Sequence, residues 1–224
     1  MTASSEDGKI FRLILASGNR DKQTEFAGFF RAEGMPSLGF ALAHAQSMAM
    51  AAPDVEESGQ SYEENALLKA RAWADRFGMP ALADDSGLEV HSLGGRPGIF
   101  SARAAPGKDA DRVNWLLGEL EGVPDRRACF VACLVVAFPA WQGGGRGYFA
   151  SEGRCFGKIA CQPAGAEGFG YDPVFIPDGH ENTFAELGSE VKSMISHRAK
   201  AMGGMALMAA SVKKYWSLCE QALL

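Results

Sequence analysis

Two adjacent aspartates, Asp84 and Asp85, follow the short apolar run "PALA" and precede a serine and a glycine. Neighbouring carboxylates repel each other and aspartate suits a strand poorly, so the pair calls for a positive partner. We expect the strand to end at the pair. Because successive strand side chains point to opposite faces, one carboxylate would face a ligand and the other would support it. Mg²⁺ accepts one or two carboxylates, and a carboxylate beside it can take a proton from water. A capped turn explains the pair equally well.

A second polar segment covers residues 17–22, follows the apolar run "LILA" and has the sequence "SGNRDK". A strand that breaks here and runs into a helix leaves free backbone N–H groups at the positive helix end, which can bind an anion. Lys22 would add a full charge in the first turn. The segment lacks the G-x-x-x-x-G-K-[ST] pattern of a P-loop, and an ordinary turn with a surface lysine is favoured when the segment is considered alone.

An acidic run, "DVEESGQSYEEN", covers residues 54–65 and contains Glu56 and Glu57. Such a run is usually a solvated surface. Lys69 lies on the helix predicted after it, near the edge of the apolar stripe, where a lysine is ordinarily exposed. Neither feature indicates a function by itself.

Two later segments combine aromatic and cationic side chains. The run "GFGYDPVF" places Phe169 and Tyr171 around a glycine, and bases stack well on aromatic faces. In "SMISHRAKA", Ser196 can cap a helix, which leaves His197 and Arg198 in the first turn, where the helix dipole disfavours cations. An arginine at this place indicates that it binds an anion or the edge of a nucleotide base. Ordinary roles explain the same residues as well: the aromatics as core residues, Ser196 as a helix cap and Arg198 as a surface residue.

The elements that must position these residues follow from hydrophobic periodicity and helix caps. The clearest element is a helix that begins at a capping box formed by Ser61 and Glu64 and ends at Gly78. Strands and helices alternate early and a hairpin follows, which predicts an α/β domain with a mixed sheet. The predicted elements are strands at 10–16 and 80–84, helices at 20–33, 62–77 and 109–122, antiparallel strands at 128–138 and 145–160, and a helical tail after 179.

Length and composition bound the possible functions. The chain of 224 residues fits one domain over 1–224, and no apolar run approaches the roughly 18 residues of a membrane span. Acidic residues stand where a signal peptide would be basic, so we expect a cytoplasmic protein whose residues 1–9 form a disordered leader. The net charge of −5 argues against a nucleic-acid polymer as partner. Five cysteines without C-x-x-C spacing disfavour a structural zinc site or a disulfide framework.

Five segments taken in order, "SGNRDK", "ADDSGLEV", "GGRPGIFSAR", "GFGYDPVF" and "EVKSMISHR", resemble the inosine/xanthosine triphosphate pyrophosphatases, which act on non-canonical purine nucleotides. The resemblance runs from Leu13 to Lys200. It implies an α/β fold with a mixed, curved central sheet, flanking helices and two lobes around a nucleotide cleft, usually in a homodimer. It also implies Mg²⁺-dependent hydrolysis of ITP, dITP and XTP to the monophosphate and pyrophosphate, which cleanses the nucleotide pool.

The same resemblance assigns a role to each matching residue. Asp85 would be the proton acceptor and a metal ligand, with Asp84 and Glu57 as further metal ligands. The Ala/Met-rich segment before the acidic run leaves open whether Glu56 or Glu57 binds the metal. Lys69 would neutralise the triphosphate. The other predicted substrate-binding residues are Ser17, Gly18, Asn19, Arg20, Asp21 and Lys22 at the phosphates, and Ser86, Phe169, Gly170, Tyr171, Asp172, Lys192, His197 and Arg198, mostly around the base.

Alternatives to this function remain open from the sequence. One is a related pyrophosphatase for pyrimidine or modified nucleotides, which would share the phosphate chemistry. Another is an aspartate-nucleophile phosphatase, but its motif is Asp-x-Asp, whereas this chain has two adjacent aspartates. The third is a nucleotide sensor that binds without turnover. Hypoxanthine and xanthine present an acceptor at O6 and a donor at N1, opposite to adenine, so base choice should follow from hydrogen-bond matching. Rejection of GTP must act at its 2-amino group.

Overall fold

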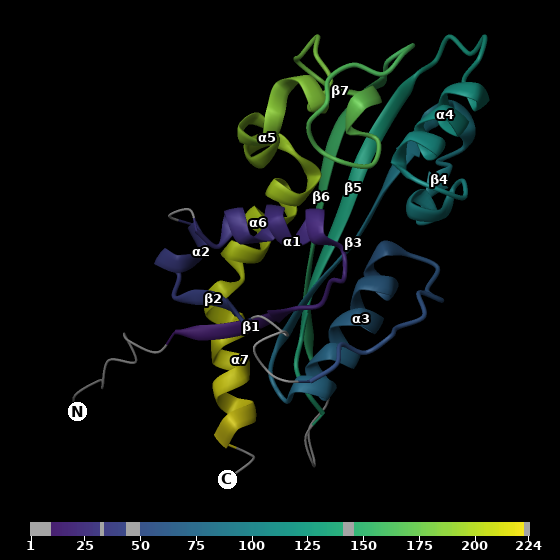
Figure 1. The fold of residues 1–224 in the computed structure, drawn as a ribbon. Helices are drawn as coiled ribbons and strands as arrows, with labels where there is room; N and C mark the ends of the chain where they lie inside the picture. Colours follow the sequence, from purple (N-terminus) through teal and green to yellow (C-terminus); the bar gives the residue numbers. More distant parts are fainter. Residues whose placement is uncertain (1–9, 32–33, 44–49, 141–145, 222–224) are drawn as a thin grey trace.

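A single mixed sheet organises the chain in the computed structural model, which describes residues 10–31, 34–43, 50–140 and 146–221. The predicted leader, 1–9, lies outside the described residues. The strand order is β2-β1-β3-β5-β6-β7, with β4 paired to β3 (Figure 1). The strands are β1 (Phe11–Leu15), β2 (Phe40–Ala43), β3 (Ala81–Val90), β4 (Pro97–Gly98), β5 (Arg127–Ala137), β6 (Tyr148–Ile159) and β7 (Phe175–Pro177).

Parallel and antiparallel pairing meet at β3. The short strands β1 and β2 run parallel to each other, and β1 pairs in parallel with the beginning of β3. On its other side β3 is antiparallel to β5 over its whole length, and β5 continues as a long antiparallel hairpin with β6. The predicted α/β class with a mixed, curved central sheet is therefore confirmed.

Helices cover both faces of this sheet. They are α1 (Arg20–Phe29), α2 (Gly34–Ser37), α3 (Tyr62–Phe77), α4 (Asp109–Glu119), α5 (Phe184–Ile195), α6 (His197–Leu207) and α7 (Ala209–Gln221), with short 3₁₀ turns at 91–93, 101–103 and 172–174. Alternate residues of β3 and β5 pack in opposite directions, as strand geometry requires. Ala83 and Val135 pack with α3, whereas Leu82 and Leu134 pack with α1, α6 and α7.

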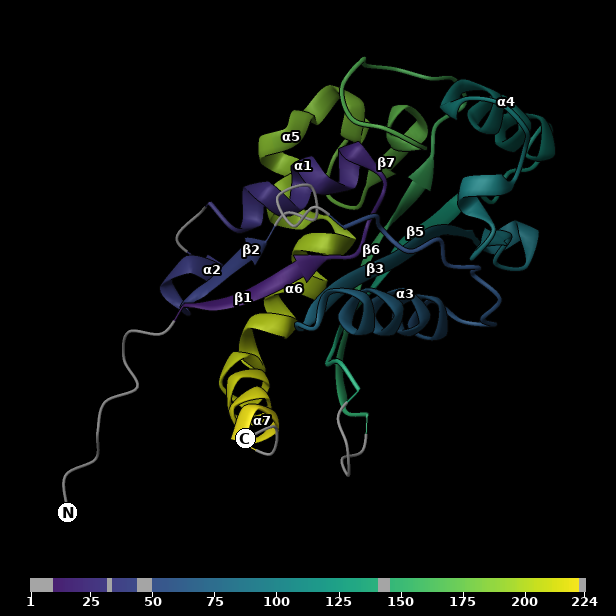
Figure 2. The same ribbon diagram turned by 60° about the horizontal axis from the view of Figure 1, so that its bottom comes forward.

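A third apolar cluster forms the core of a second lobe. It joins the far ends of β3, β5 and β6 to α4, β7 and α5, which gather at one end of the long strands (Figure 2). Phe130, Phe175 and Phe184 pack ring against ring at its centre. The two lobes share β3 and β5, so residues at the middle of these strands lie between the lobes.

The predicted end of a strand at the aspartate pair is wrong, because β3 continues through the pair to Val90. Ser86 and Gly87 pair with residues of β5 in the middle of the sheet, and this pairing overrides the local turn preference of Ser-Gly. Gly87 is needed for close packing here. A Cβ atom would lie 2.2 Å from the carbonyl oxygen of Gly98 and 2.7 Å from Ser101 Oγ.

Other predicted local features are confirmed. Ser61 caps α3 by accepting from the backbone N–H of Glu64, and Gly78 ends the helix in the left-handed conformation. Ser196 caps α6. The cysteines are unpaired, and all but Cys161 are buried. The strand β2 (Phe40–Ala43) was missed, because no element was predicted between residues 33 and 62. Among the helices that the structure describes, none is long and apolar enough to cross a bilayer.

Candidate active site

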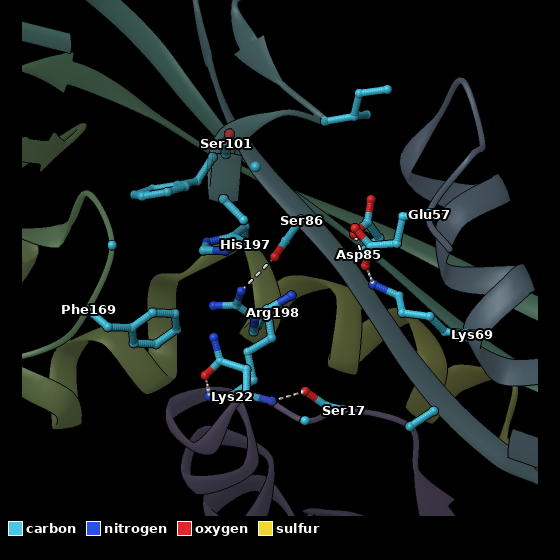
Figure 3. A pocket seen from close by; sticks show the side chains of 18 of the residues that line it. Ser17, Lys22, Glu57, Lys69, Asp85, Ser86, Ser101, Phe169, His197 and Arg198 are labelled. Carbon is cyan, nitrogen blue, oxygen red and sulfur yellow. Dashed lines mark hydrogen bonds and ion pairs between the residues drawn. The ribbon is translucent and has the colours of Figure 1, made fainter. Parts of the chain in front are cut away.

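A pocket of about 450 Å³ opens between the two lobes (Figure 3). Its walls come from the loop between β1 and α1, the acidic loop before α3, the middle of β3, and the segments 99–102 and 169–172. The predicted residues that line it are Ser17, Gly18, Asn19, Lys22, Glu57, Lys69, Asp85, Ser86, Phe169, Gly170, Tyr171, Asp172, Lys192, His197 and Arg198. Arg20 and Asp21 are exposed, and neither they nor Asp84 belong to the lining of this pocket within the described chain.

The beginning of α1 is built from its own polar side chains. Asn19 caps the helix, because its side-chain oxygen accepts from the backbone N–H groups of Asp21 and Lys22 at 2.9 and 3.1 Å. Ser17 Oγ accepts from the N–H of Asn19 at 3.2 Å. The cap fixes the helix N-terminus at the pocket, with Gly18 between the two polar residues. Positive partial charge at this end suits a phosphate.

Asp85 lies at the opposite wall, joined to α3 by Lys69. The ammonium group of Lys69 contacts Asp85 Oδ1 at 3.0 Å and Glu57 Oε1 at 2.7 Å. Asn65, one turn before Lys69 on the same helix, donates to Asp85 Oδ2 at 3.3 Å. Two carboxylates therefore flank one cation at the pocket wall. Glu56 is exposed, so the structure brings Glu57 rather than Glu56 to this cluster.

Burial gives these two carboxylates different acidities. Desolvation raises the pKa of Asp85 above its ordinary value, and Lys69 offsets only part of this effect. Glu57 is less buried. Its hydrogen bond and attraction to Lys69 outweigh desolvation, so its pKa is lowered. A carboxylate with a raised pKa is the better proton acceptor, and this property favours Asp85 as the base.

Asp84 faces the other side of β3, where cations surround it. Its Oδ2 contacts Lys22 Nζ at 2.5 Å and Arg198 Nε at 3.3 Å, and accepts from Ser86 Oγ at 3.2 Å. Burial would raise the pKa of Asp84, but the two cations outweigh it and hold this pKa far below its usual range. Through Oδ2 the carboxylate thus holds Lys22 and Arg198 in place, while Oδ1 is buried without a hydrogen-bond partner.

The donor set at Glu57 and Asp85 fits a hard divalent cation. Lys69 already lies between these carboxylates, which shows that the place accepts positive charge. Mg²⁺ needs only one or two protein carboxylates when phosphate oxygens and water complete its shell. In the described part of the chain, no group of three or more acidic, histidine or cysteine side chains is arranged to hold a metal ion. Asp84 Oδ2 is turned towards Lys22 and Arg198, and the assignment of Asp84 as a further metal ligand stays a prediction.

The opposite end of the pocket is aromatic and cationic. Figure 3 shows Phe169 across the pocket from Lys69, with His197 and Arg198 between them. Lys192 Nζ lies 4.4 Å from the centre of the Phe169 ring, and the Arg198 guanidinium carbon lies 5.3 Å from it. Lys192 also contacts Asp172 Oδ2 at 2.5 Å. This end combines a flat ring with hydrogen-bond donors, which suits a purine base.

His197 is an uncharged member of this wall. Its ring stacks on Phe130, with centroids 4.7 Å apart and planes 11° apart. Complete burial, with the nearby Arg198 charge, lowers the pKa of His197 well below its ordinary value. The imidazole is therefore neutral at pH 7, and Arg198 and Lys192 carry the positive charge beside Phe169.

Sequence reasoning missed several residues of the site. Asn65 is fully buried against Asp85, and Glu25 on α1 bridges Lys192 and Arg198 at 2.7 and 2.9 Å. Asp109 and Arg112 at the start of α4 also line the pocket. The spacing of Asn65 four residues before Lys69 was an available signal, because such residues share one helix face. No local signal pairs Glu25 with residues more than 160 positions away.

Comparison with known proteins agrees with this geometry. The model of the Ham1 family matches residues 13–207. A dITP/XTP pyrophosphatase of Leifsonia xyli is 43% identical over 201 residues, which cover 88% of this chain and 94% of that protein. The corresponding protein of Geobacillus kaustophilus is 45% identical over 197 residues, covering 85% and 90%. A solved HAM1 protein from Coxiella burnetii superposes with a TM-score of 0.76 at 35% identity, covering 90% of this chain and 99% of that one.

Proposed function

The chain belongs to the Ham1 family, and we propose that it hydrolyses dITP, ITP and XTP to the monophosphate and pyrophosphate. The observation that carries this proposal is the division of one pocket into two ends. Asp85 with Lys69 and Glu57 lies at one end, and Phe169 with Lys192 and Arg198 lies at the other. A nucleotide that spans them would place its base on the aromatic end and its phosphates near Asp85.

Phosphate binding follows from the cations and the helix end. The N-terminus of α1 and Lys22 would hold phosphate oxygens on one side, and Lys69 would hold them on the other. An ammonium group has three donors, so Lys22 can keep its contact with Asp84 and still bind a phosphate. These cations make an acidic chain locally suitable for a triphosphate.

Asp85 is the proposed general base. Its carboxylate would accept the proton of the water that attacks the α-phosphorus, and pyrophosphate would leave. Lys69 and Asn65 hold this carboxylate in place. Glu57 and Asp85 would bind Mg²⁺, which when bound offsets negative charge on the phosphates and orients them for attack. Removal of divalent metal is expected to stop turnover, and added Mg²⁺ to restore it.

Recognition of the base rests on donors at the aromatic end. Lys192 and Arg198 can donate to the O6 acceptor of hypoxanthine or xanthine while the ring stacks against Phe169. Adenine presents a donor at this position, so buried donors would face each other and ATP would be rejected. A pool-cleansing role follows from this selectivity. The predicted homodimer and cytoplasmic location stay predictions, and light scattering of the purified protein tests the first.

Product analysis tests the reaction and the base preference together. The enzyme is incubated with Mg²⁺ and with ITP, dITP, XTP, ATP, GTP or a pyrimidine triphosphate, and pyrophosphate and orthophosphate are measured separately. We expect monophosphate and pyrophosphate from the oxo-purines, and little product from ATP. Orthophosphate as the first product would place the attack at the γ-phosphorus and contradict the assigned role of Asp85. Tight binding of ITP without product would indicate a sensor.

A further inference from the structure

The loop that carries Phe169 is rich in glycine and is held by two carboxylates. Gly168 and Gly170, on either side of Phe169, have φ values of 79° and 63°. The N–H of Phe169 donates to Asp172 Oδ2 at 2.9 Å, and the next N–H, of Gly170, donates to Asp109 Oδ2 at 2.5 Å. Asp172 belongs to the predicted site, whereas Asp109 comes from another element, the first turn of α4.

Asp109 is itself held by a second contact. Its Oδ1 forms an ion pair with Arg112 one turn along α4, and Arg112 donates to the carbonyl oxygen of Gly107 at 3.1 Å. Both side chains line the pocket. The Arg112 contact leaves one carboxylate oxygen of Asp109 directed at the Gly170 N–H. A hydrogen bond to an ionised acceptor is stronger than one between neutral groups.

We propose that Asp109 is a positioning residue for base recognition: it fixes the Gly170 backbone and thereby the ring plane of Phe169. The proposal rests on the proposed function, in which Phe169 stacks on the purine. Glycines on both sides of Phe169 leave the loop many conformations, and Asp109 selects the one in which the ring lies beside Lys192 and Arg198. Asp109 thus acts on the base end of the pocket and not on the phosphate end.

The position of Asp109 separates this role from a general structural one. Its side chain is 44% exposed, and it belongs to none of the three apolar clusters. Asp111 in the same helical turn supports the start of α4 by accepting from the N–H of Lys108 at 2.7 Å. Asp111→Ala is therefore a matched control, because it weakens the same helix end without touching Gly170.

The test compares Asp109→Ala, Asp109→Asn and Asp111→Ala in full-length enzyme. Loss of a charge-assisted hydrogen bond predicts that Asp109→Ala raises the KM for dITP about tenfold, leaves kcat within about twofold, and lowers the preference for dITP over GTP. Asp109→Asn keeps one acceptor, the amide oxygen, for Gly170 but turns an NH2 group towards Arg112, so its rise in KM should be smaller than that of Asp109→Ala. Asp111→Ala should retain the wild-type preference.

Inorganic tripolyphosphate, which lacks a base, is the second probe. Its inhibition constant should be the same for wild type and Asp109→Ala. An unchanged KM for dITP in Asp109→Ala, or an equal loss of dITP and tripolyphosphate binding, would overturn the inference.

Calorimetric measurement of IMP binding distinguishes a failure of this inference from a failure of the proposed function. If the wild type binds IMP but does not hydrolyse dITP, the proposed function fails, and the ratio of IMP affinities between wild type and Asp109→Ala decides the inference. If the wild type neither binds IMP nor hydrolyses dITP, both fail.

Discussion

The two faces of β3 show how neighbouring aspartates acquire different tasks. Asp84 is buried between Lys22 and Arg198, and their charges hold its pKa far below its usual range. Asp85 faces the pocket, and desolvation raises its pKa despite its contact with Lys69. The two residues have the same chemistry and consecutive positions. Their difference comes from the helices packed on either face of the strand.

The comparison teaches that a charged side chain near a site can serve the site without touching the substrate. On the Asp84 face, α1 and α6 each supply a cation that also lines the pocket. Asp84, which does not line the pocket, holds these two cations together through its ion pairs with both. On the Asp85 face, α3 supplies Lys69 and Asn65, which orient a carboxylate that itself lines the pocket. One face of β3 positions two cations of the pocket, and the other presents the carboxylate that we propose as the base.

The largest effect on turnover is expected from Asp85→Asn. An amide cannot accept the proton of the attacking water, so kcat should fall about 10³-fold, within the range for loss of a general base. Nucleotide binding should persist, because Lys22, Lys69 and the aromatic end remain. Pyrophosphate release and calorimetry with dITP measure the two properties. Activity within tenfold of wild type would remove Asp85 from the proton transfer.

Asp84→Asn should instead act mainly on stability. It leaves Lys22 and Arg198 without their buried counter-charge, and breaking such a buried pair is expected to cost about 3 kcal/mol of unfolding free energy. Urea unfolding followed by circular dichroism measures this loss. Asp125→Asn is the matched control, since Asp125 also pairs with an arginine but lies at the surface. Equal stability of Asp84→Asn and wild type would mean that the ion pairs around Asp84 do not hold the fold.

A smaller effect separates Glu57 from its neighbour Glu56. Glu57→Gln removes a carboxylate oxygen from the proposed metal donor set, so the Mg²⁺ concentration for half-maximal activity should rise at least about tenfold. Glu56 is exposed, and Glu56→Gln should behave as wild type. Magnesium titrations of pyrophosphate release distinguish the two variants. A higher Mg²⁺ requirement in Glu56→Gln, with wild-type behaviour in Glu57→Gln, would assign the metal to Glu56 instead.

The smallest expected effect is the pH dependence of the Asp84 contribution. An unfolded chain protonates this carboxyl near pH 3.9, whereas the folded state does so at much lower pH. The contribution of Asp84 is therefore full above about pH 4 and is lost as pH falls towards its folded pKa. Without metal, the stability gap between wild type and Asp84→Asn should narrow by up to about 1.4 kcal/mol per pH unit below pH 4. A gap that is constant from pH 6 to pH 2 contradicts this.

Local signals predicted much of the fold. For β3 they predicted the opposite orientation of its two aspartates but not the point at which the strand ends. The caps at Ser61 and Ser196, the glycine after α3 and the alternation of apolar residues are short-range features, and the structure confirms them. The Ser-Gly turn after the aspartates was predicted from local preference and is wrong, because pairing with β5 determines the conformation there. The opposite orientation of Asp84 and Asp85 followed from strand geometry alone.

Partners far apart in sequence were beyond such reasoning. Lys69 resembled a surface lysine because its carboxylate partners, Glu57 and Asp85, lie 12 and 16 positions away and on different elements. The placement of Arg198 beside Asp84 spans 114 positions. The resemblance to a family supplied these residues as candidates, and only the fold shows which cation pairs with which carboxylate.

Because α6 lies late in the chain, the ribosome synthesises the two ends of the pocket at different times. Its first residues, His197 and Arg198, supply the wall beside Phe169, while β1, α3 and β3 all precede residue 91. At about 5–20 residues per second, a ribosome needs several seconds to pass from one group to the other. Of the two cations that contact Asp84 in the folded protein, only Lys22 has been synthesised before residue 198 is reached. The proposed base, Asp85, is therefore synthesised well before Phe169, Lys192 and Arg198, and the proposed base-binding end of the pocket is completed late in translation.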